Sequence, residues 1–181
     1  MNLPAVVILA YLALGLELGL RPALAVGGGV APSVLFPLLV YICLFAPTRQ
    51  ALWSALAFGV AADLVSPWTT PGGGRQLVVV GPGALGYAAG AYLTLTVRAL
   101  VIRRNPLTLA VLSVIAMALA GVVSVFLLSL RSLYDPHLAI QPAPELVRRT
   151  LSALYTGLSA GLMGVVLVPL AGPLGFAERK R

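Results

Sequence analysis

Residues 107–130 form a stretch of 24 residues without a single charged side chain. About 20 predominantly apolar residues are enough for a helix to cross the hydrocarbon core of a bilayer, so this stretch predicts a transmembrane helix. The whole chain has the same character, because 60% of its 181 residues are hydrophobic and only 9% are charged, against about 25% charged in soluble domains. This composition excludes a soluble enzyme and a disordered chain, and it predicts a polytopic membrane protein.

Five further apolar segments accompany this stretch, and proline or glycine residues separate them. The six expected helices cover residues 4–20, 33–46, 51–65, 82–102, 107–130 and 150–172. We therefore expect an all-α fold, a bundle of about six transmembrane helices that forms one integral membrane domain over residues 1–181. The first segment lacks the preceding basic region of a signal peptide and contains Glu17, which favours a retained span.

The basic residues predict which side of the membrane each connection occupies, since cytoplasmic connections are enriched in Lys and Arg. With both chain ends inside, seven basic residues lie on the cytoplasmic side and five, Arg148 and Arg149 among them, lie outside. Arg103, Arg104 and the tail of residues 179–181 carry most of this bias. We therefore expect both termini in the cytoplasm and residues 132–146 outside. Attraction of the basic residues to lipid headgroups then explains the net charge of +7. We therefore expect no nucleic-acid binding.

Glycines recur at four-residue spacing in two of the expected helices, a pattern that lets membrane helices approach closely. Gly86 and Gly90 form one such face, and Gly157 and Gly161 form another, which Gly164 continues. We expect these faces to pack against other helices, either of this chain or of a partner protein.

Two glycine-rich patterns imitate cofactor or catalytic motifs without the other residues that the chemistry needs. Residues 81–86 match G-x-G-x-x-G, but they open a membrane helix and no acid follows about 20 residues later. Residues 157–161 match G-x-S-x-G, the pattern of a nucleophilic serine. The only histidine, His137, falls in a proline-rich connection, where no span would hold it within hydrogen-bond reach of the serine as a general base. With one histidine and one cysteine, Cys43, the chain also lacks a metal-ligand set. We expect no enzymatic activity, no cofactor and no metal.

Two carboxylates fall within the expected spans, where an ionisable group is a functional candidate. Glu17 precedes Arg21 by four residues, a spacing that favours an interfacial ion pair. Asp63 has no cation four residues away in either direction. It either reaches the headgroups, contacts a partner protein or locks the third helix against the fourth. The candidate partners for this internal contact are Arg98, Tyr87 and Tyr92.

Residues 47–104 combine these features in one order. A G-x-x-x-D-L motif from Gly59 to Leu64 ends one helix, a glycine-containing connection follows, and residues 83–93 read GALGYAAGAYL before basic residues close the segment. This pattern resembles the rod shape-determining MreD family. The resemblance implies a non-enzymatic scaffold of the cell-elongation complex, which makes peptidoglycan at the bacterial inner membrane. It also implies four partners: an MreC-like bitopic protein, a RodA-type glycosyltransferase, its penicillin-binding transpeptidase and, indirectly, MreB.

The MreD family is similar in fold to the substrate-binding membrane subunits of energy-coupling-factor vitamin transporters, which supplies the alternative function. In that case a face of small residues, Ala51, Ala55 and Gly59, would dock the transporter partner. Amide and charged side chains are absent from the middle of the expected spans, which disfavours a pocket for a polar solute. We therefore expect the chain to bind protein partners and membrane lipid rather than a small solute.

Overall fold

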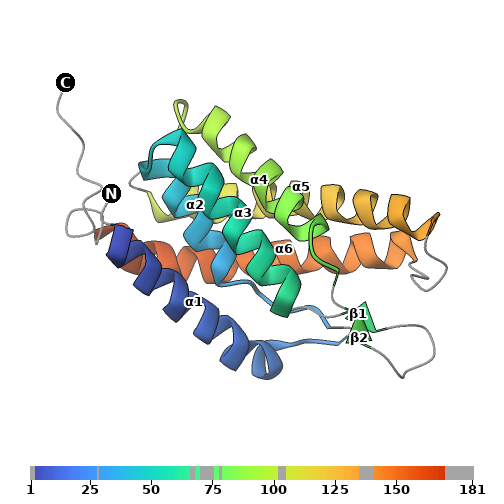
Figure 1. The fold of residues 1–181 in the computed structure, drawn as a ribbon. Helices are drawn as coiled ribbons and strands as arrows, with labels where there is room; N and C mark the ends of the chain where they lie inside the picture. The colour runs from blue at the N-terminus through green and yellow to red at the C-terminus, as the bar shows by residue number, and fades with distance from the viewer. Residues whose placement is uncertain are drawn as a thin grey trace.

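A computed structural model describes residues 3–27, 29–65, 68–69, 76–77, 79–101, 105–134 and 141–169. In these residues the apolar runs form six helices (Figure 1). They are α1 (Leu3–Leu24), α2 (Leu35–Phe45), α3 (Thr48–Val65), α4 (Pro82–Val97), α5 (Pro106–Ser132) and α6 (Pro142–Leu167). The strands β1 (Trp68–Thr69) and β2 (Gln76–Leu77) form a two-residue antiparallel pair between α3 and α4. Apart from this pair, the described fold is all-helical, as the composition predicts.

Consecutive helices run in opposite directions, so their ends gather at two ends of the bundle (Figure 1). The hairpin end, which we name for β1 and β2, holds the ends of α1, α3 and α5 and the starts of α2, α4 and α6. The terminal end holds the start of α1 and the end of α6. Six described helices that alternate in direction therefore return the chain to the side on which α1 begins.

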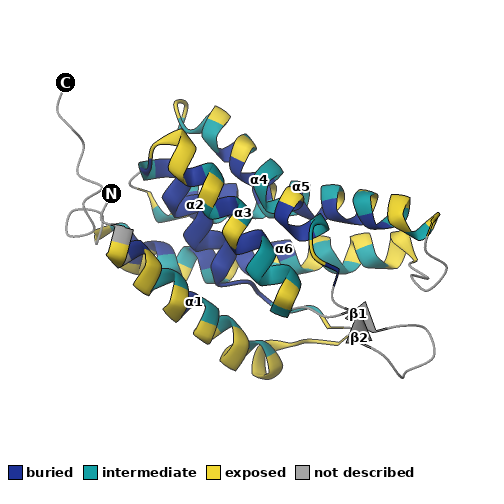
Figure 2. Cartoon of the chain, in the orientation of Figure 1, coloured by how far each residue is buried: buried dark blue, intermediate teal, exposed yellow. Residues whose placement is uncertain are grey.

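Helix α2 forms the centre of the core. All of its residues from Leu35 to Leu44 are buried, and it contacts each of the other five helices. Figure 2 shows it enclosed by its neighbours. A helix that is apolar on every side is stable only in such an enclosed position. Its 11 residues span roughly 16 Å, about half of the bilayer's hydrocarbon thickness.

Three helices are long and apolar enough to cross a membrane, namely α1 over Val6–Leu24, α5 and α6. Their outer faces carry exposed apolar side chains, and Figure 2 marks much of α1 as exposed. These features indicate a membrane protein. Of the other three spans that the sequence predicts, α2 and α4 are shorter than a crossing helix, and α3 is less apolar.

The start of α6 lies about two turns before the position expected from the sequence. Pro142 occupies the first turn, where the missing N–H of a proline costs nothing. Glu145 then pairs with Arg148 and Arg149, at 2.7 Å in each case, at the three- and four-residue spacing of a helix. Charged residues that the sequence assigned to an outer connection therefore belong to α6. Helix α1 likewise continues past Arg21 to Leu24.

Candidate functional site

The candidate site begins where the Glu17 carboxylate of α1 meets the start of α2. Its Oε2 atom accepts hydrogen bonds from the backbone N–H groups of Val34, at 3.1 Å, and Leu35, at 2.8 Å. The Ser33 hydroxyl donates to the same oxygen at 3.0 Å. The first N–H groups of a helix lack partners within the helix and form its positive end, so a carboxylate stabilises them. Glu17 thus fastens α1 to α2, a role that its spacing from Arg21 does not predict.

Ser33 extends this contact to α6. Its backbone N–H donates to Thr156 Oγ1 at 2.9 Å, and its carbonyl oxygen accepts from the Ser159 hydroxyl at 2.9 Å. Its own hydroxyl accepts the N–H of Phe36 at 3.2 Å, as a residue at the start of a helix does. The start of α2 is therefore held from two sides, by α1 and by α6.

Asp63 has the equivalent role between α3 and α4. Its Oδ2 atom accepts the N–H of Gly81 at 2.9 Å, and its Oδ1 atom accepts the N–H of Gly83 at 3.0 Å. The residue between them, Pro82, has no N–H to offer. The N–H of Ala84 lies 3.4 Å from Oδ2. A carboxylate at the end of α3 therefore satisfies the first free donors of α4.

This contact locks the third helix against the fourth, one of the three roles that the sequence leaves open for Asp63. The partners differ from those expected, because the described hydrogen bonds of Asp63 go to backbone groups and not to Arg98, Tyr87 or Tyr92. In the sequence, the start of α4 is marked only by the residues Gly-Pro-Gly at positions 81–83. A search for oppositely charged or polar side chains does not find backbone N–H donors.

Glycines make the contact between α3 and α4 possible. A Cβ atom on Gly83 would collide with the Asp63 carboxylate, and a Cβ atom on Gly59 would stand 2.8 Å from the Gly83 carbonyl oxygen. Gly81 has a φ of +128°, a conformation that side chains rarely tolerate. The G-x-x-x-D-L motif and the glycines after it therefore form one interlocked contact.

Gly86 and Gly90 continue this close approach from α4 to α5. A Cβ atom on Gly86 would lie 2.6 Å from the Ala120 carbonyl oxygen, and one on Gly90 would lie 2.7 Å from that of Ala116. Both distances are too short for a real contact, and the atoms in the way belong to the backbone. This glycine face is consequently filled by α5.

The second glycine face, on α6, also meets α5 but more loosely. A Cβ atom on Gly164 would lie 3.1 Å from the Pro106 Cα atom, and one on Gly161 would lie 3.9 Å from the Ala110 Cβ atom. At Gly157 the obstacle is the tip of a valine side chain, 2.5 Å away. Both faces that the sequence offers to other helices are therefore occupied within the chain.

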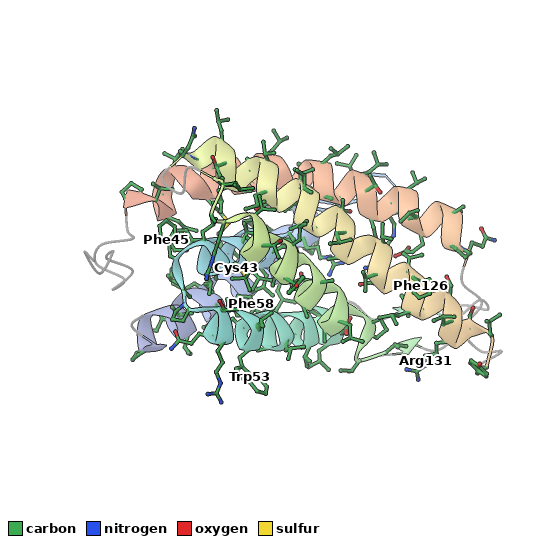
Figure 3. All side chains as sticks on the ribbon, turned by 90° about the horizontal axis from the view of Figure 1, so that it is seen from above. Cys43, Phe45, Trp53, Phe58, Phe126 and Arg131 are labelled. Atoms are coloured by element: carbon green, nitrogen blue, oxygen red, sulfur yellow. The ribbon has the colours of Figure 1, made fainter. Side chains whose placement is uncertain are left out.

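Arg98 lies at the terminal end, far from Asp63. Its Nη1 atom donates to the carbonyl oxygens of Ala46, at 3.0 Å, and Cys43, at 3.4 Å, and its Nη2 atom donates to Thr48 Oγ1 at 3.1 Å. The last carbonyls of a helix lack partners and form its negative end. A guanidinium group therefore closes the end of α2, and Figure 3 shows Cys43 inside the bundle there.

A cavity of about 650 Å³ lies at the hairpin end, bordered by five helices, α1 and α3 to α6, and by the segment that precedes α2. Its charged and aromatic lining residues are Glu17, Arg21, Asp63, Tyr87, Arg148 and Arg149. Its volume falls within the range of about 300–1,000 Å³ that is typical of small-molecule sites. The two carboxylates with capping roles thus also border this cavity.

The sequence does not predict this cavity. The sequence places no amide or charged side chains near the middle of the expected spans, whereas the structure gathers charged side chains at the hairpin end of the bundle. Arg148 and Arg149 were expected in an outer connection, and Glu145, three and four residues before them, is the signal that places them on a helix. Among the described residues, no group of three or more His, Cys, Asp or Glu side chains could hold a metal ion.

Several predicted features lie outside the described residues. They are His137, the connection at residues 70–75, the Arg103 and Arg104 pair, and the basic tail at residues 179–181.

The helices and the cavity define the class of the protein: a helical membrane protein with a polar cavity at one end of its bundle. No protein-family model matches the chain, and the comparisons with curated proteins and with solved structures give no significant match.

Proposed function

We propose that this chain is a non-enzymatic, multi-pass scaffold of the cell-elongation complex in a bacterial inner membrane. The observation that carries the proposal is the contact between Asp63 and the start of α4, with Gly59 and Gly83 packed around it. The residues on which the resemblance to the MreD family rests therefore act together as one structural unit. A pattern whose parts depend on one another is more specific than the separate glycines and aspartate would be.

The proposal includes six helices that cross the membrane in alternation, with both termini in the cytoplasm. The alternating directions of the described helices support this topology (Figure 1). In this arrangement α2 lies within the bundle and α4 packs against α3 and α5, and these neighbouring helices make up for the short length of both. The hairpin end then faces the outside.

The partner surface in this proposal lies on α6, because the two glycine faces are filled. Four apolar side chains at helical spacing point away from the bundle with exposures of 57–75%. They are Leu154, Leu158, Leu162 and Val165. Such a stripe can face either lipid or the transmembrane helix of a bitopic partner such as an MreC-like protein. RodA-type glycosyltransferase, penicillin-binding transpeptidase and MreB would join through that partner.

The cavity favours a second candidate, the substrate-binding membrane subunit of a vitamin transporter of the energy-coupling-factor type. A polar cavity of about 650 Å³ is what that function needs. We rank this candidate second because Glu17 and Asp63, the two carboxylates at the border of the cavity, already bind backbone N–H groups at the starts of α2 and α4.

The two candidate functions predict different partner proteins in native membranes. The tagged full-length chain, purified from such membranes in mild detergent, should bring down an MreC-like protein and a RodA-type glycosyltransferase. Recovery of a transporter ATPase instead, together with stabilisation by a vitamin at micromolar concentration, would establish the second candidate and overturn the first.

A further inference from the structure

The two sides of the bundle differ in height at the hairpin end. Helix α4 begins at Pro82, whose carbonyl oxygen accepts the Ser124 hydroxyl at 3.0 Å, so the start of α4 lies level with Ser124 of α5. Helix α5 continues from there to Ser132, roughly 12 Å further. Figure 1 shows α5 and α6 side by side beyond the start of α4. We name residues 125–132 of α5 the extension.

The last turns of α1 and α3 lie near the level at which α4 begins. Asp63, in the last turn of α3, accepts the N–H of Gly83 at 3.0 Å. Arg21, in the last turn of α1, borders the same cavity as Asp63 and Gly83. The bundle therefore has a low side, formed by α1, α3 and α4, and a high side, formed by α5 and α6.

The high side carries an apolar outer face along α5. Its exposed side chains recur at helical spacing with exposures of 42–71%. They are Leu107, Val111, Ile115, Val122, Phe126 and Leu130. Residues 107–130 contain no charge, and they cover roughly 36 Å, more than the roughly 30 Å of a bilayer's hydrocarbon core. Contact of such a face with water is costly, so an apolar surrounding must cover Phe126 and Leu130 in the extension.

The residues that end this face identify lipid as the cover. Arg131 directly follows Leu130 and is exposed at the end of α5 (Figure 3), and Tyr134 comes about one turn later with 88% exposure. Arginine and tyrosine are typical of the headgroup level at the edges of membrane proteins. The face also continues into the extension without a break from the part of α5 that is suited to cross the membrane.

The low side favours a thinner leaflet. Glu17, Asp63 and Arg148 border the cavity near the level of the start of α4, roughly 10 Å below Arg131 along α5. A charged side chain in the hydrocarbon core is costly, and bilayers thin locally around such groups. If the bilayer reached Arg131 on every side, these charges would lie within the hydrocarbon core. A lower leaflet along the low side keeps them at the headgroup level instead.

We propose that this protein holds the bilayer at two heights. Acyl chains of the leaflet at the hairpin end cover the extension up to Arg131, and the same leaflet is thinned by roughly 10 Å along α3 and α4. The partner of the extension is thus a lipid surface. The inference depends neither on which side of the membrane the hairpin end faces nor on the scaffold function, so the two proposals can fail separately.

The test measures the depth of nitroxide spin labels on the full-length chain in dioleoylphosphatidylcholine liposomes. Oxygen, which concentrates in the hydrocarbon core, and a water-soluble nickel chelate are the two collision partners. The labels are attached to Leu130→Cys in the extension and to Leu64→Cys at the end of α3, each in a Cys43→Ser background. Both side chains are exposed, at 42% and 56%. Ile115→Cys, 52% exposed in the middle of α5, is the control for a deep position.

We expect the two labels to show an inverted order of depth. Leu64 lies near the level of the start of α4, roughly 9 Å below Leu130 along α5, so a flat bilayer would make Leu64 the deeper position. In the uneven bilayer, the Leu130 label collides mainly with oxygen, as the Ile115 label does. The Leu64 label then collides more often with the nickel chelate than the Leu130 label.

Two results would overturn the proposal. A Leu130 label that meets the nickel chelate more often than the Leu64 label would show that the extension stands in water beside a flat bilayer. A Leu130 label that neither reagent reaches would show that a protein, either a partner or a second copy of this chain, covers the extension.

A pair of charge substitutions gives a second readout that needs no label. Leu130→Glu should lower the Tm in the same liposomes, because it places a carboxylate among acyl chains. Tyr134→Glu, about one turn further along α5, is the matched control and should leave the Tm unchanged. Equal Tm values for the two variants would contradict the proposal.

Discussion

Glu17 and Arg98 bind opposite ends of the same buried helix, α2. Glu17 accepts the N–H of Leu35 at its start, at 2.8 Å, and Arg98 donates to the carbonyl oxygen of Ala46 at its end, at 3.0 Å. Each charge has the sign that complements the helix dipole at that end. Free backbone groups are costly in an apolar surrounding, so these two ionised side chains stabilise a short helix that water cannot reach.

Glu17→Gln should lower the free energy of unfolding by about 1–3 kcal/mol, because it leaves N–H groups at the start of α2 without a charged acceptor. Thermal or denaturant unfolding of the purified chain in detergent measures the loss. Arg49→Gln is the control, since Arg49 is an exposed charge on α3 whose removal should change stability by no more than about 0.5 kcal/mol. Equal stability of the Glu17→Gln and Arg49→Gln variants would show that the cap contributes nothing.

Asp63→Asn should cost a similar amount, since Asp63 caps α4 as Glu17 caps α2. The hydrogen bonds give the two carboxylates equivalent roles, although only Glu17 has a cation four residues away. Amide hydrogen exchange locates the effect. Exchange at Gly83 and Ala84 should accelerate in Asp63→Asn and stay slow in Glu17→Gln. Unchanged exchange at both amides in Asp63→Asn would contradict the capping role.

The order of the helices follows from the sequence, because apolar runs and their proline and glycine boundaries are local features. The start of α6 does not, since a proline in a first turn, such as Pro142, looks like a proline in a connection until Glu145 is seen to pair with Arg148. The proline content of residues 132–146 predicted a connection over that whole range.

The site depends on contacts that a single sequence does not display. Asp63 binds backbone groups 18 to 21 residues away, and backbone N–H groups are the same at every position except proline. The cavity forms where five helices meet the segment that precedes α2. Arg21 and Arg148 are far apart in the sequence, so no spacing rule joins them.

The two glycine faces should differ in their tolerance of alanine. Gly90→Ala places a methyl group 2.7 Å from the Ala116 carbonyl oxygen, a backbone atom, and should destabilise the bundle by about 1–3 kcal/mol. Gly161→Ala makes an ordinary contact of 3.9 Å and should be close to neutral. Folded yield and Tm in detergent measure both variants. A neutral Gly90→Ala would mean that α4 and α5 pack less closely than described.

The proposed topology predicts opposite labelling of two exposed positions. Leu100, 87% exposed at the terminal end, should face the cytoplasm, and Tyr134, 88% exposed at the hairpin end, should face the outside. Each is changed to cysteine in a Cys43→Ser background and treated with a membrane-impermeant maleimide on intact cells. Tyr134→Cys should react at once and Leu100→Cys only after permeabilisation. The reverse pattern would invert the protein in the membrane.

The central claim, that this chain binds a bitopic elongation protein along α6, is tested most directly by photo-cross-linking in native membranes. A photoreactive amino acid at Leu158 or Leu162, which are 69% and 75% exposed, places the probe on the proposed partner surface. The same residue at Tyr11, 78% exposed on α1, is the matched control. The account predicts a covalent adduct with an MreC-like protein from both α6 positions and not from Tyr11. Adducts from α6 with a transporter subunit, or with no protein at all, would contradict it.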